Sequence, residues 1–332
     1  MPLPRTLAVA PLTLAAVLGA SVAFADASRL PAEVGWNGGD IETARSLAVG
    51  GAVRALGGGT TSLYANPANL ALQRVYHLEA LASIGADARR QTYGAGAVDS
   101  VSGRLAGGIG GHYGFMDPDG IDRKWTDLRL GLAFPFSEKL YAGLSGRYLK
   151  LKQNGTGPLG SSYASGGLAG ETMLESFSFD AGITLKPNEQ FAIGVLGQNL
   201  TNPGTGFQPT MLGGGIGWGG SDLVLEADVL ADFTTYADAN GKSQAKMRAM
   251  GGLDYLAGDH YPVRLGYRWD QGLRTHAVSG GLGYVDPQFS LEVSMRRTVA
   301  GPETLTPSTT VVIGLQYFLE SSGITRAPTD LE

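Results

Sequence analysis

The sequence predicts an all-β protein, a transmembrane antiparallel β-barrel of about fourteen strands. Three observations predict it: a leader typical of exported proteins, long segments that alternate apolar with polar residues, and connections that alternate between short and long. Proteins of the outer membrane of Gram-negative bacteria combine all three features. That membrane is therefore the expected location.

The first 25 residues have the three parts of a cleaved signal peptide. Arg5 supplies a positive charge, an apolar run follows from Leu7 to Val22, and Ala23-Phe24-Ala25 fits the small-residue cleavage box ahead of Asp26. Beyond this leader, no apolar run approaches the ~20 residues that a spanning helix needs. Any passage through a membrane is expected to use strands.

The composition argues against several other classes of protein. The chain has no cysteine, so a disulfide framework and a thiolate metal site are both excluded. A net charge of -5 argues against a nucleic-acid partner. The four histidines fall on different expected elements, so no metal site, cofactor or catalytic cluster is expected, and the protein is predicted not to be an enzyme. The 51 glycines suit curved strands and a crowded barrel interior.

Residues 26–75 are expected to form a hatch, a segment that plugs the lumen of the barrel. This part lacks sustained alternation, has a possible short helix around Ile41 to Leu47, and becomes rich in glycine over residues 50–59. A barrel of about fourteen strands has a lumen wide enough to need filling. Residues 321–332 are polar and are expected to be a periplasmic extension.

Residues 76–320 are expected to form the barrel itself. In residues 223–233 an apolar face containing Leu225 and Val229 alternates with a face that carries Glu226 and Asp228. Soluble sandwiches also alternate, but export and strands near the ~9–11 residues of a membrane crossing favour the barrel. The expected strands are 76–85, 89–99, 104–114, 125–134, 139–152, 173–186, 190–199, 210–218, 222–235, 246–256, 261–270, 274–285, 288–297 and 308–318. The aromatic residues expected in the interfacial girdles are Trp125, Phe134, Tyr148, Trp218, Tyr255, Tyr284, Tyr317 and Phe318.

The connections support the same topology, because outer-membrane barrels have short periplasmic turns and longer external loops. The short connections are 137–138, 186–189, 219–221, 258–260 and 286–287. The long ones, which fall between them, are 117–124, 153–171, 201–209, 234–245 and 298–307. The first and sixth external loops are expected to be short.

Charged residues recur on the face of the strands that is predicted to line the lumen. They are Asp180, Glu226, Asp228, Asp232, Arg248, Asp254, Arg264, Arg268, Asp270, Glu292 and Arg296. Such residues can line a polar conduit, but pairing with one another and with the plug is favoured, because each partner offsets the cost of desolvating the other.

Two motifs ahead of the first expected strand resemble the FadL-like outer-membrane proteins, a family that includes the PorV branch. The motifs are Ala52-Val53-Arg54-Ala55-Leu56-Gly57-Gly58-Gly59 and Tyr64-Ala65-Asn66-Pro67-Ala68-Asn69-Leu70. The resemblance implies a barrel of fourteen strands with a plugging N-terminus. It also implies a gating role at the end of the hatch for Arg54, Gly57, Gly58, Asn66, Pro67 and Ala68. The alternative for Asn66 and Pro67 is a plain turn, since Asn-Pro commonly begins one.

The resemblance implies two different functions. FadL-type members take up long-chain fatty acids or other small hydrophobic compounds passively, whereas members of the PorV branch serve secretion or assembly without transporting small molecules. Apolar residues of the external loops are expected to capture a ligand, namely Leu159, Tyr163, Leu168 and Phe207. The expected partners are outer-membrane lipid, hydrophobic small molecules, the barrel-assembly machinery and, in the alternative, secretion-system proteins.

Overall fold

The computed structural model describes residues 30–31, 42–117, 122–152, 172–201, 208–236, 242–303 and 305–319. The expected signal peptide, the C-terminal extension and all four residues proposed for ligand capture (Leu159, Tyr163, Leu168 and Phe207) lie outside the described residues.

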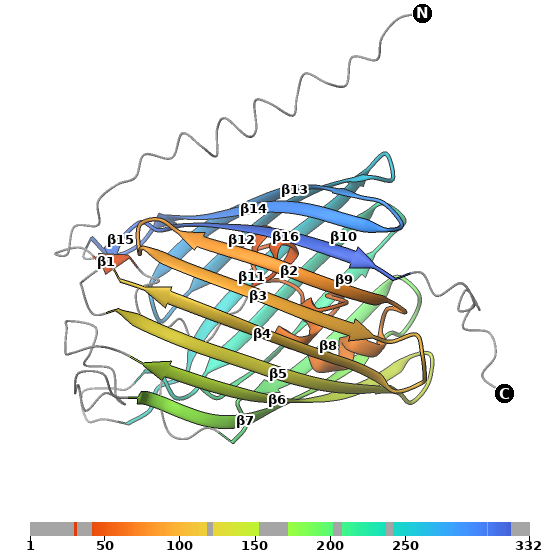
Figure 1. Ribbon diagram of the computed structural model, residues 1–332, viewed down its shortest axis with the longest axis horizontal. Coiled ribbons are helices and arrows are strands. Elements are labelled where there is room, and N and C mark those ends of the chain that lie inside the picture. Colours follow the sequence, from red (N-terminus) through yellow and green to blue (C-terminus); the bar gives the residue numbers. More distant parts are fainter. Residues whose placement is uncertain are drawn as a thin grey trace, which may run out of the picture.

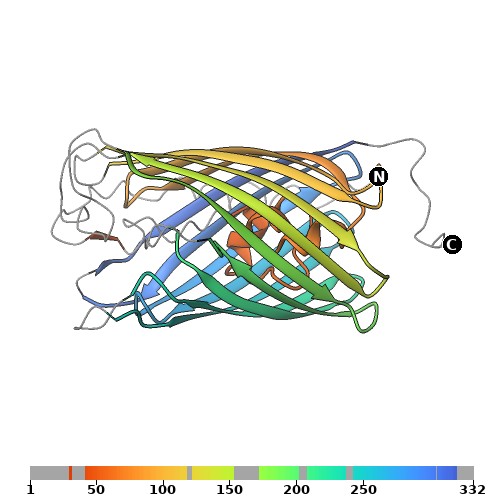
Figure 2. The same ribbon diagram turned by 90° about the horizontal axis from the view of Figure 1, so that it is seen from below.

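Fourteen antiparallel strands form one closed barrel, which confirms the predicted fold class. Figures 1 and 2 show the strands strongly tilted against the barrel axis. The strands are β2 (Tyr76–Gly85), β3 (Arg90–Asp99), β4 (Ala106–Met116), β5 (Arg123–Pro135), β6 (Leu140–Lys152), β7 (Thr172–Leu185), β8 (Phe191–Gln198), β9 (Met211–Gly219), β10 (Leu223–Asp232), β11 (Lys246–Ala257), β12 (Tyr261–Asp270), β13 (Thr275–Val285), β14 (Phe289–Ala300) and β16 (Thr309–Phe318). The ladder between β16 and β2 closes the barrel.

The outer face of the barrel is apolar, as the alternation predicts. On β10, Leu225 and Val229 are exposed, whereas Glu226 and Asp228 between them are buried in the lumen. Exposed apolar side chains continue around the other strands, and Leu144 is 63% exposed. In water, an apolar surface of this size would cause the protein to associate with other molecules. In the hydrocarbon core of a membrane, an apolar outer surface is the stable arrangement.

Two of the predicted girdle residues face the lumen instead. Trp125 is 2% exposed, and the Arg90 guanidinium lies 5.6 Å from the centre of its ring. Phe318 packs edge-on against the buried His77, with ring centres 5.7 Å apart. The prediction was wrong for both because closeness to a strand end does not decide the face, which is set by the period of two. Tyr317, one residue earlier, is exposed.

The two ends of the barrel differ, as the lengths of the connections predict. β2 begins and β16 ends at one end, called here the turn end, which lies at the right of Figure 1. The connections at the turn end are 100–105, 136–139, 186–190, 220–222, 258–260 and 286–288. The opposite or loop end carries the long connections 153–171, 199–210, 233–245 and 301–308, together with 117–122, which equals 100–105 in length, and the short 86–89 and 271–274.

The hatch, described from residue 42 to residue 75, lies inside the barrel (Figures 1 and 2). It contains α2 (Ala44–Ala48), α3 (Thr61–Tyr64) and the 3-10 helix η2 (Pro67–Ala71). α2 packs against β12, β13, β14 and β16, whereas η2 packs against β4 to β7. Among the described residues, no helix is long and apolar enough to cross a bilayer.

A short strand pair that the sequence did not predict lies at the loop end. β1 (Leu30–Pro31) pairs in parallel with β15 (Leu305–Thr306). Two residues on each side are too few to show a period, so only the tertiary structure reveals the pair. The N-terminal part of the chain is therefore anchored at the loop end, and the hatch leaves the lumen at the turn end, where β2 begins.

Inward-facing glycines explain how the hatch fits the lumen so closely. A Cβ atom at Gly143 would lie 2.5 Å from the carbonyl oxygen of Pro67, and one at Gly266 would lie 2.1 Å from the amide nitrogen of Gly50. Any side chain at these positions would displace the hatch from the wall. The glycines that contact the hatch in this way are Gly108, Gly110, Gly131, Gly143, Gly182, Gly194, Gly217, Gly252, Gly266 and Gly281.

The wall has a short ladder between β7 and β8. Only five residue pairs join these strands, from Ala181↔Gly197 to Leu185↔Ile193. Asn199 then adopts a left-handed conformation (φ 51), and farther along the chain the fully buried Gln208 donates to the Ser178 hydroxyl at 2.6 Å. Within the described part of the chain, residues 172–178 have no strand partner on this side. We call this part of the wall the β7–β8 seam.

Candidate functional site

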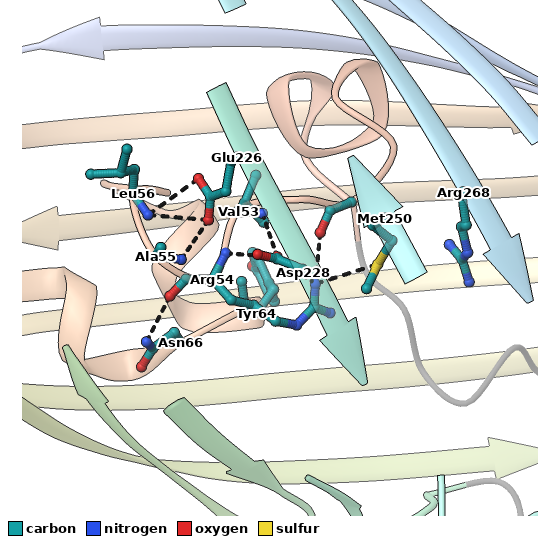
Figure 3. Close-up of polar contacts among 12 residues, drawn as sticks. Val53, Arg54, Ala55, Leu56, Tyr64, Asn66, Glu226, Asp228, Met250 and Arg268 are labelled. Carbon is teal, nitrogen blue, oxygen red and sulfur yellow. Dashed lines mark hydrogen bonds and ion pairs between the residues drawn. The ribbon is translucent and has the colours of Figure 1, made fainter. Parts of the chain in front are cut away.

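The turn at residues 53–56 of the hatch is held by two carboxylates on β10 (Figure 3). Asp228 accepts hydrogen bonds from the amides of Val53 (2.8 Å) and Arg54 (3.0 Å), while Glu226 accepts from the amides of Ala55 and Leu56. The Arg54 guanidinium also pairs with Asp228 at 3.1 Å and donates to the carbonyl of Gly51 at 2.6 Å. Four consecutive amides of one turn thus bind the barrel wall, and we call this set of contacts the latch.

Asn66 joins the latch to the next part of the hatch. Its amide donates to the carbonyl of Arg54 at 2.8 Å and to the Thr184 hydroxyl on β7 at 3.0 Å. The Asn69 amide donates to the same Arg54 carbonyl at 3.1 Å, and Asn69 accepts from Thr184 at 2.5 Å. The Asn66 side chain also caps η2, where its oxygen accepts from the amide of Ala68 at 3.1 Å. Asn66 therefore fixes a turn and also holds the latch in place.

The other residues assigned to the gate shape the backbone. Pro67 is the first residue of η2, where a missing amide proton costs nothing, and the preceding Asn66 is extended (φ -145, ψ 108). Gly57 donates to the carbonyl of Val53 at 3.0 Å, and a Cβ atom there would lie 2.3 Å from that oxygen. Gly58 is equally close to the Gln73 side chain. These contacts leave no room for larger residues.

A second charged network, on β5 to β7, holds α3. The Asp127 carboxylate pairs with Arg129 at 3.2 Å and with Arg147 at 2.6 Å, and Arg129 also lies 3.5 Å from Asp180. The Arg129 guanidinium donates to the carbonyl of Leu63 at 3.2 Å and lies 5.2 Å from the centre of the Tyr64 ring. Burial raises the pKa of the Tyr64 phenol, so this ring stays neutral beside the arginine.

Asp127, Arg129 and Arg147 were not among the charges predicted for the lumen. All three are nearly fully buried. Their signal was present in β5, where Asp127 and Arg129 alternate with the exposed Leu128 and Leu130. Applying the period of two to this strand would have found both residues.

Most of the charges predicted for the lumen pair with each other or with the hatch. Asp254 binds Arg264 at 2.9 Å and Arg45 of the hatch at 3.2 Å, and Arg264 also binds Glu292 at 2.9 Å. The remaining pairs are Arg248 with Asp270 at 2.9 Å, and Arg268 and Arg296 with Glu42 of the hatch. Asp232 differs, because it accepts hydrogen bonds from the amides of Thr234 and Thr235 in its own connection.

Two cavities lie on opposite sides of the hatch. The cavity on the loop side is small, about 30 Å³, and is lined by charged and polar groups, among them Arg129, Arg147 and Asp180. The cavity on the turn side measures about 410 Å³ and is lined in part by His77, Asp254 and Arg264. Thr61 of α3 lines both cavities, so the two cavities come close to each other at this residue of the hatch.

Within the described ranges, no three histidine or acidic side chains come together as metal ligands do. The charged side chains of the lumen are engaged instead in ion pairs and in hydrogen bonds to the hatch backbone. The site is therefore an anchored plug with a cavity on each side.

Neither a protein-family model nor a curated protein sequence matches this chain. Several solved structures do match this chain in fold. The toluene transporter TbuX of Ralstonia pickettii is 15% identical, with a TM-score of 0.61 over 85% of this chain and 99% of TbuX. The monoaromatic hydrocarbon channel CymD is 15% identical, with a TM-score of 0.60 over 82% of this chain and 96% of CymD.

A FadL homologue of Pseudomonas aeruginosa is 13% identical, with a TM-score of 0.59 over 83% of this chain and 98% of its own length. At such low identity the similarity shows a shared fold. The chain thus has the fold of FadL-type channels, as the resemblance of its hatch motifs predicts.

Proposed function

We propose that the protein is an outer-membrane channel for the passive uptake of small hydrophobic compounds, with long-chain fatty acids or monoaromatic hydrocarbons as the candidate cargo. The fold is that of channels for hydrocarbons. The loop end would face outward and the turn end the periplasm, the orientation in which barrels carry long loops outside. A cleaved signal peptide and the barrel-assembly machinery would bring the chain there.

The observation that carries this proposal is the hatch between two cavities. The cavity on the turn side measures about 410 Å³ and the one on the loop side about 30 Å³, and Thr61 of the hatch lines both. The latch consists of hydrogen bonds and an ion pair, which water in the lumen can replace when the turn at residues 53–56 moves away. Val53 and Arg54 of this turn line the cavity on the loop side, so displacing the turn would widen that cavity.

The β7–β8 seam supports a second route, through the wall. Few backbone hydrogen bonds close the barrel there, so an apolar compound that reaches the lumen at the loop end could leave sideways into the bilayer. This route suits hydrophobic cargo better than the cavity on the turn side, which is lined by charges.

One observation favours a different function, that of a secretion or assembly component similar to the PorV branch. The cavity on the loop side is lined by Arg129, Arg147 and Asp180, whereas a site for hydrophobic cargo is usually apolar. In this alternative the hatch would stay closed, and the loops would bind other proteins.

A reversible cross-link across the latch tests the proposal. The Cβ of Ala55 lies 3.4 Å from the Cβ position of Gly217 on β9, close to the ~3.5–4.5 Å of a disulfide. The chain has no cysteine of its own, so Ala55→Cys with Gly217→Cys gives a single bond that a reductant opens. Every cysteine variant also carries Leu56→Ala, because a Cβ atom at Gly217 would otherwise lie 2.5 Å from the Leu56 side chain. Uptake of radiolabelled long-chain fatty acid and toluene would be measured in Gram-negative cells that lack their own channel for these compounds.

We expect saturable uptake by the wild-type protein and by the reduced variant, and little uptake by the oxidised variant. Each single cysteine variant is the control, since neither forms the bond. Absence of uptake by a folded wild-type barrel would contradict the proposal and favour the secretion or assembly function. Uptake that is equal in the oxidised and reduced states would exclude movement of the hatch and leave the β7–β8 seam as the route.

A further inference from the structure

The outer wall carries one large apolar groove. It measures about 940 Å³ and crosses β5 to β9, and its sides are formed by outward-facing residues such as Leu132, Leu144, Phe179, Ile183 and Val195. Pockets that hold small molecules measure ~300–1,000 Å³, so this groove is large enough for a ligand. Its lining is almost entirely apolar, in contrast to the lumen.

The groove begins at the turn end and reaches the middle of β6, and toward β8 and β9 it extends to Leu200 and Leu212. Leu105, Phe134 and Phe136 line it beside the turns, and on β6 it extends to Gly146. From Leu140 to Gly146 the chain rises ~20 Å along the strand, which a tilt of ~40° reduces to ~15 Å of depth. That is half of the ~30 Å hydrocarbon core, the thickness of one leaflet.

Three cations, called here the rim, lie on the turns below the groove and outside its lining. The Arg104 guanidinium lies 5.2 Å from the centre of the Phe134 ring, which lines the groove, and donates to the carbonyl of Pro135 at 3.5 Å. Lys139 and Lys186 lie on adjacent turns, joined by a 2.7 Å hydrogen bond between their backbones. Glu138 and Glu189 are exposed at the same end.

The rim differs from the lysines at the loop end. There, Lys124 pairs with Asp122 at 2.8 Å and Lys150 pairs with Glu175 at 2.7 Å. Within the described ranges, none of Arg104, Lys139 and Lys186 forms an ion pair with a carboxylate. Their charges are thus available to an anion at the membrane surface.

We propose that this groove binds one phospholipid with an anionic headgroup, from the leaflet at the turn end. An acyl chain would lie in the apolar groove, and the headgroup phosphate would contact the rim. The positive charge of the rim matches the headgroup phosphate. The depth of the groove along β6 matches the length of the acyl chains in one leaflet. Binding would fill the hollow between β5 and β9 and cover the lower part of the wall beside the β7–β8 seam.

Native mass spectrometry of the full-length barrel released from detergent tests this proposal. The probes are phosphatidylglycerol and phosphatidylcholine with identical palmitoyl and oleoyl chains. We expect one tightly retained phosphatidylglycerol, bound on the order of tenfold more strongly than phosphatidylcholine, because cations near a membrane surface each attract anionic lipid. The triple variant Arg104→Gln, Lys139→Gln, Lys186→Gln should lose this preference.

A second variant tests the groove itself. Ala181 faces outward in the groove, and Ala181→Phe should fill it and reduce retention of both lipids. The matched control is Ala227→Phe, at an exposed position of β10 outside the groove, and the charge control is Lys124→Gln, Lys150→Gln, Lys152→Gln at the loop end. Both controls should bind phosphatidylglycerol as the wild type does.

Three outcomes would overturn the proposal. They are equal retention of the two lipids by the wild type, an unchanged preference in the rim variant, or a dimer that excludes lipid and dissociates in Ala181→Phe. The last result would assign the groove to a second copy of the chain. The uptake measured with the latch cross-link does not depend on this result, so the two proposals fail separately.

Discussion

The two halves of the hatch differ in the balance of charged and apolar contacts that hold them. Ion pairs with the wall are concentrated in the first half, whose Leu47 and Ala52 also pack in small apolar clusters, whereas the largest apolar cluster belongs to the second half. The first half, residues 42–56, is attached to β10–β14 by charged groups: Glu42, Arg45 and Arg54 all form ion pairs with the wall. The second half, residues 61–71, is packed among apolar groups, where Leu63 and Leu70 are fully buried against Val98, Ala106 and Ala133.

This difference indicates which half can move. Water that enters the lumen can replace hydrogen bonds and ion pairs at modest cost, whereas removing Leu63 and Leu70 from their contacts would leave cavities or expose apolar surface. The second half is also followed directly by β2. We therefore expect the first half to be the mobile part, with the Asn66 and Asn69 contacts to Arg54 as the joint between the halves.

Removing the latch carboxylate should have the largest effect. Asp228→Ala leaves the Arg54 guanidinium and two amides without their buried acceptor, which we expect to cost about 3 kcal/mol of unfolding free energy. Urea unfolding in lipid vesicles measures the loss, and hydrogen exchange should quicken in residues 42–56 only. Asp232→Ala on the same strand is the control. Faster exchange in residues 61–71 as well would contradict the division into halves.

A side chain at one of the inward-facing glycines should destabilise the second half of the hatch. In Gly143→Val the new Cβ would lie 2.5 Å from the Pro67 backbone, which cannot rotate away as a side chain can. We expect a loss of about 1–3 kcal/mol, as for other overpacked sites, with faster exchange centred on residues 61–71. Gly251→Val is the matched control, because a Cβ atom there meets no atom within 4 Å. A similar loss in the control would show that strand glycines matter for reasons other than seating the hatch.

Substitution of Asn66 should affect both halves. Asn66→Ala removes the cap of η2 and the hydrogen bond to Arg54, and we expect it to lower the unfolding free energy by about 1–2 kcal/mol. Asn66→Ser separates the two roles, since the neutral hydroxyl can keep the cap but the amide donor to Arg54 is lost. Hydrogen exchange should therefore quicken only in residues 42–56 in Asn66→Ser, and in both halves in Asn66→Ala. Identical profiles in the two variants would exclude a role as the joint.

The barrel was largely predictable from the sequence, because each strand must place one apolar face toward lipid. The period of two located all fourteen strands, and the lengths of the connections indicated which end of the barrel carries the short turns. The errors concern features that this alternation does not determine. Trp125 was assigned to the girdle from its position near a strand end. The pairing of β1 with β15 rests on backbone contacts of two residues in each strand. Neither feature leaves a periodic pattern.

The candidate site was predictable only in part. The hatch motifs identified Arg54 and Asn66, and the alternation of β10 identified Glu226 and Asp228. Nothing in the sequence joins the two sets, because Arg54 and Asp228 lie 174 residues apart and meet only when the barrel closes around the hatch. Pairings of this kind depend on the register of the whole barrel, which the pattern of a single strand does not determine.

The smallest effect is expected at the most exposed charge of the first half. Arg45 pairs with Asp254, but its side chain is 21% exposed and Asp254 keeps Arg264 as a partner at 2.9 Å. Arg45→Gln should therefore lower the unfolding free energy by less than about 1 kcal/mol, as for other partly solvated pairs. Arg264→Gln is the comparison, because it leaves the buried Glu292 without this partner and should cost more. If Arg45→Gln destabilised the barrel as much as Asp228→Ala, the charges of the first half would act as one cooperative network, and the latch would not be its main attachment.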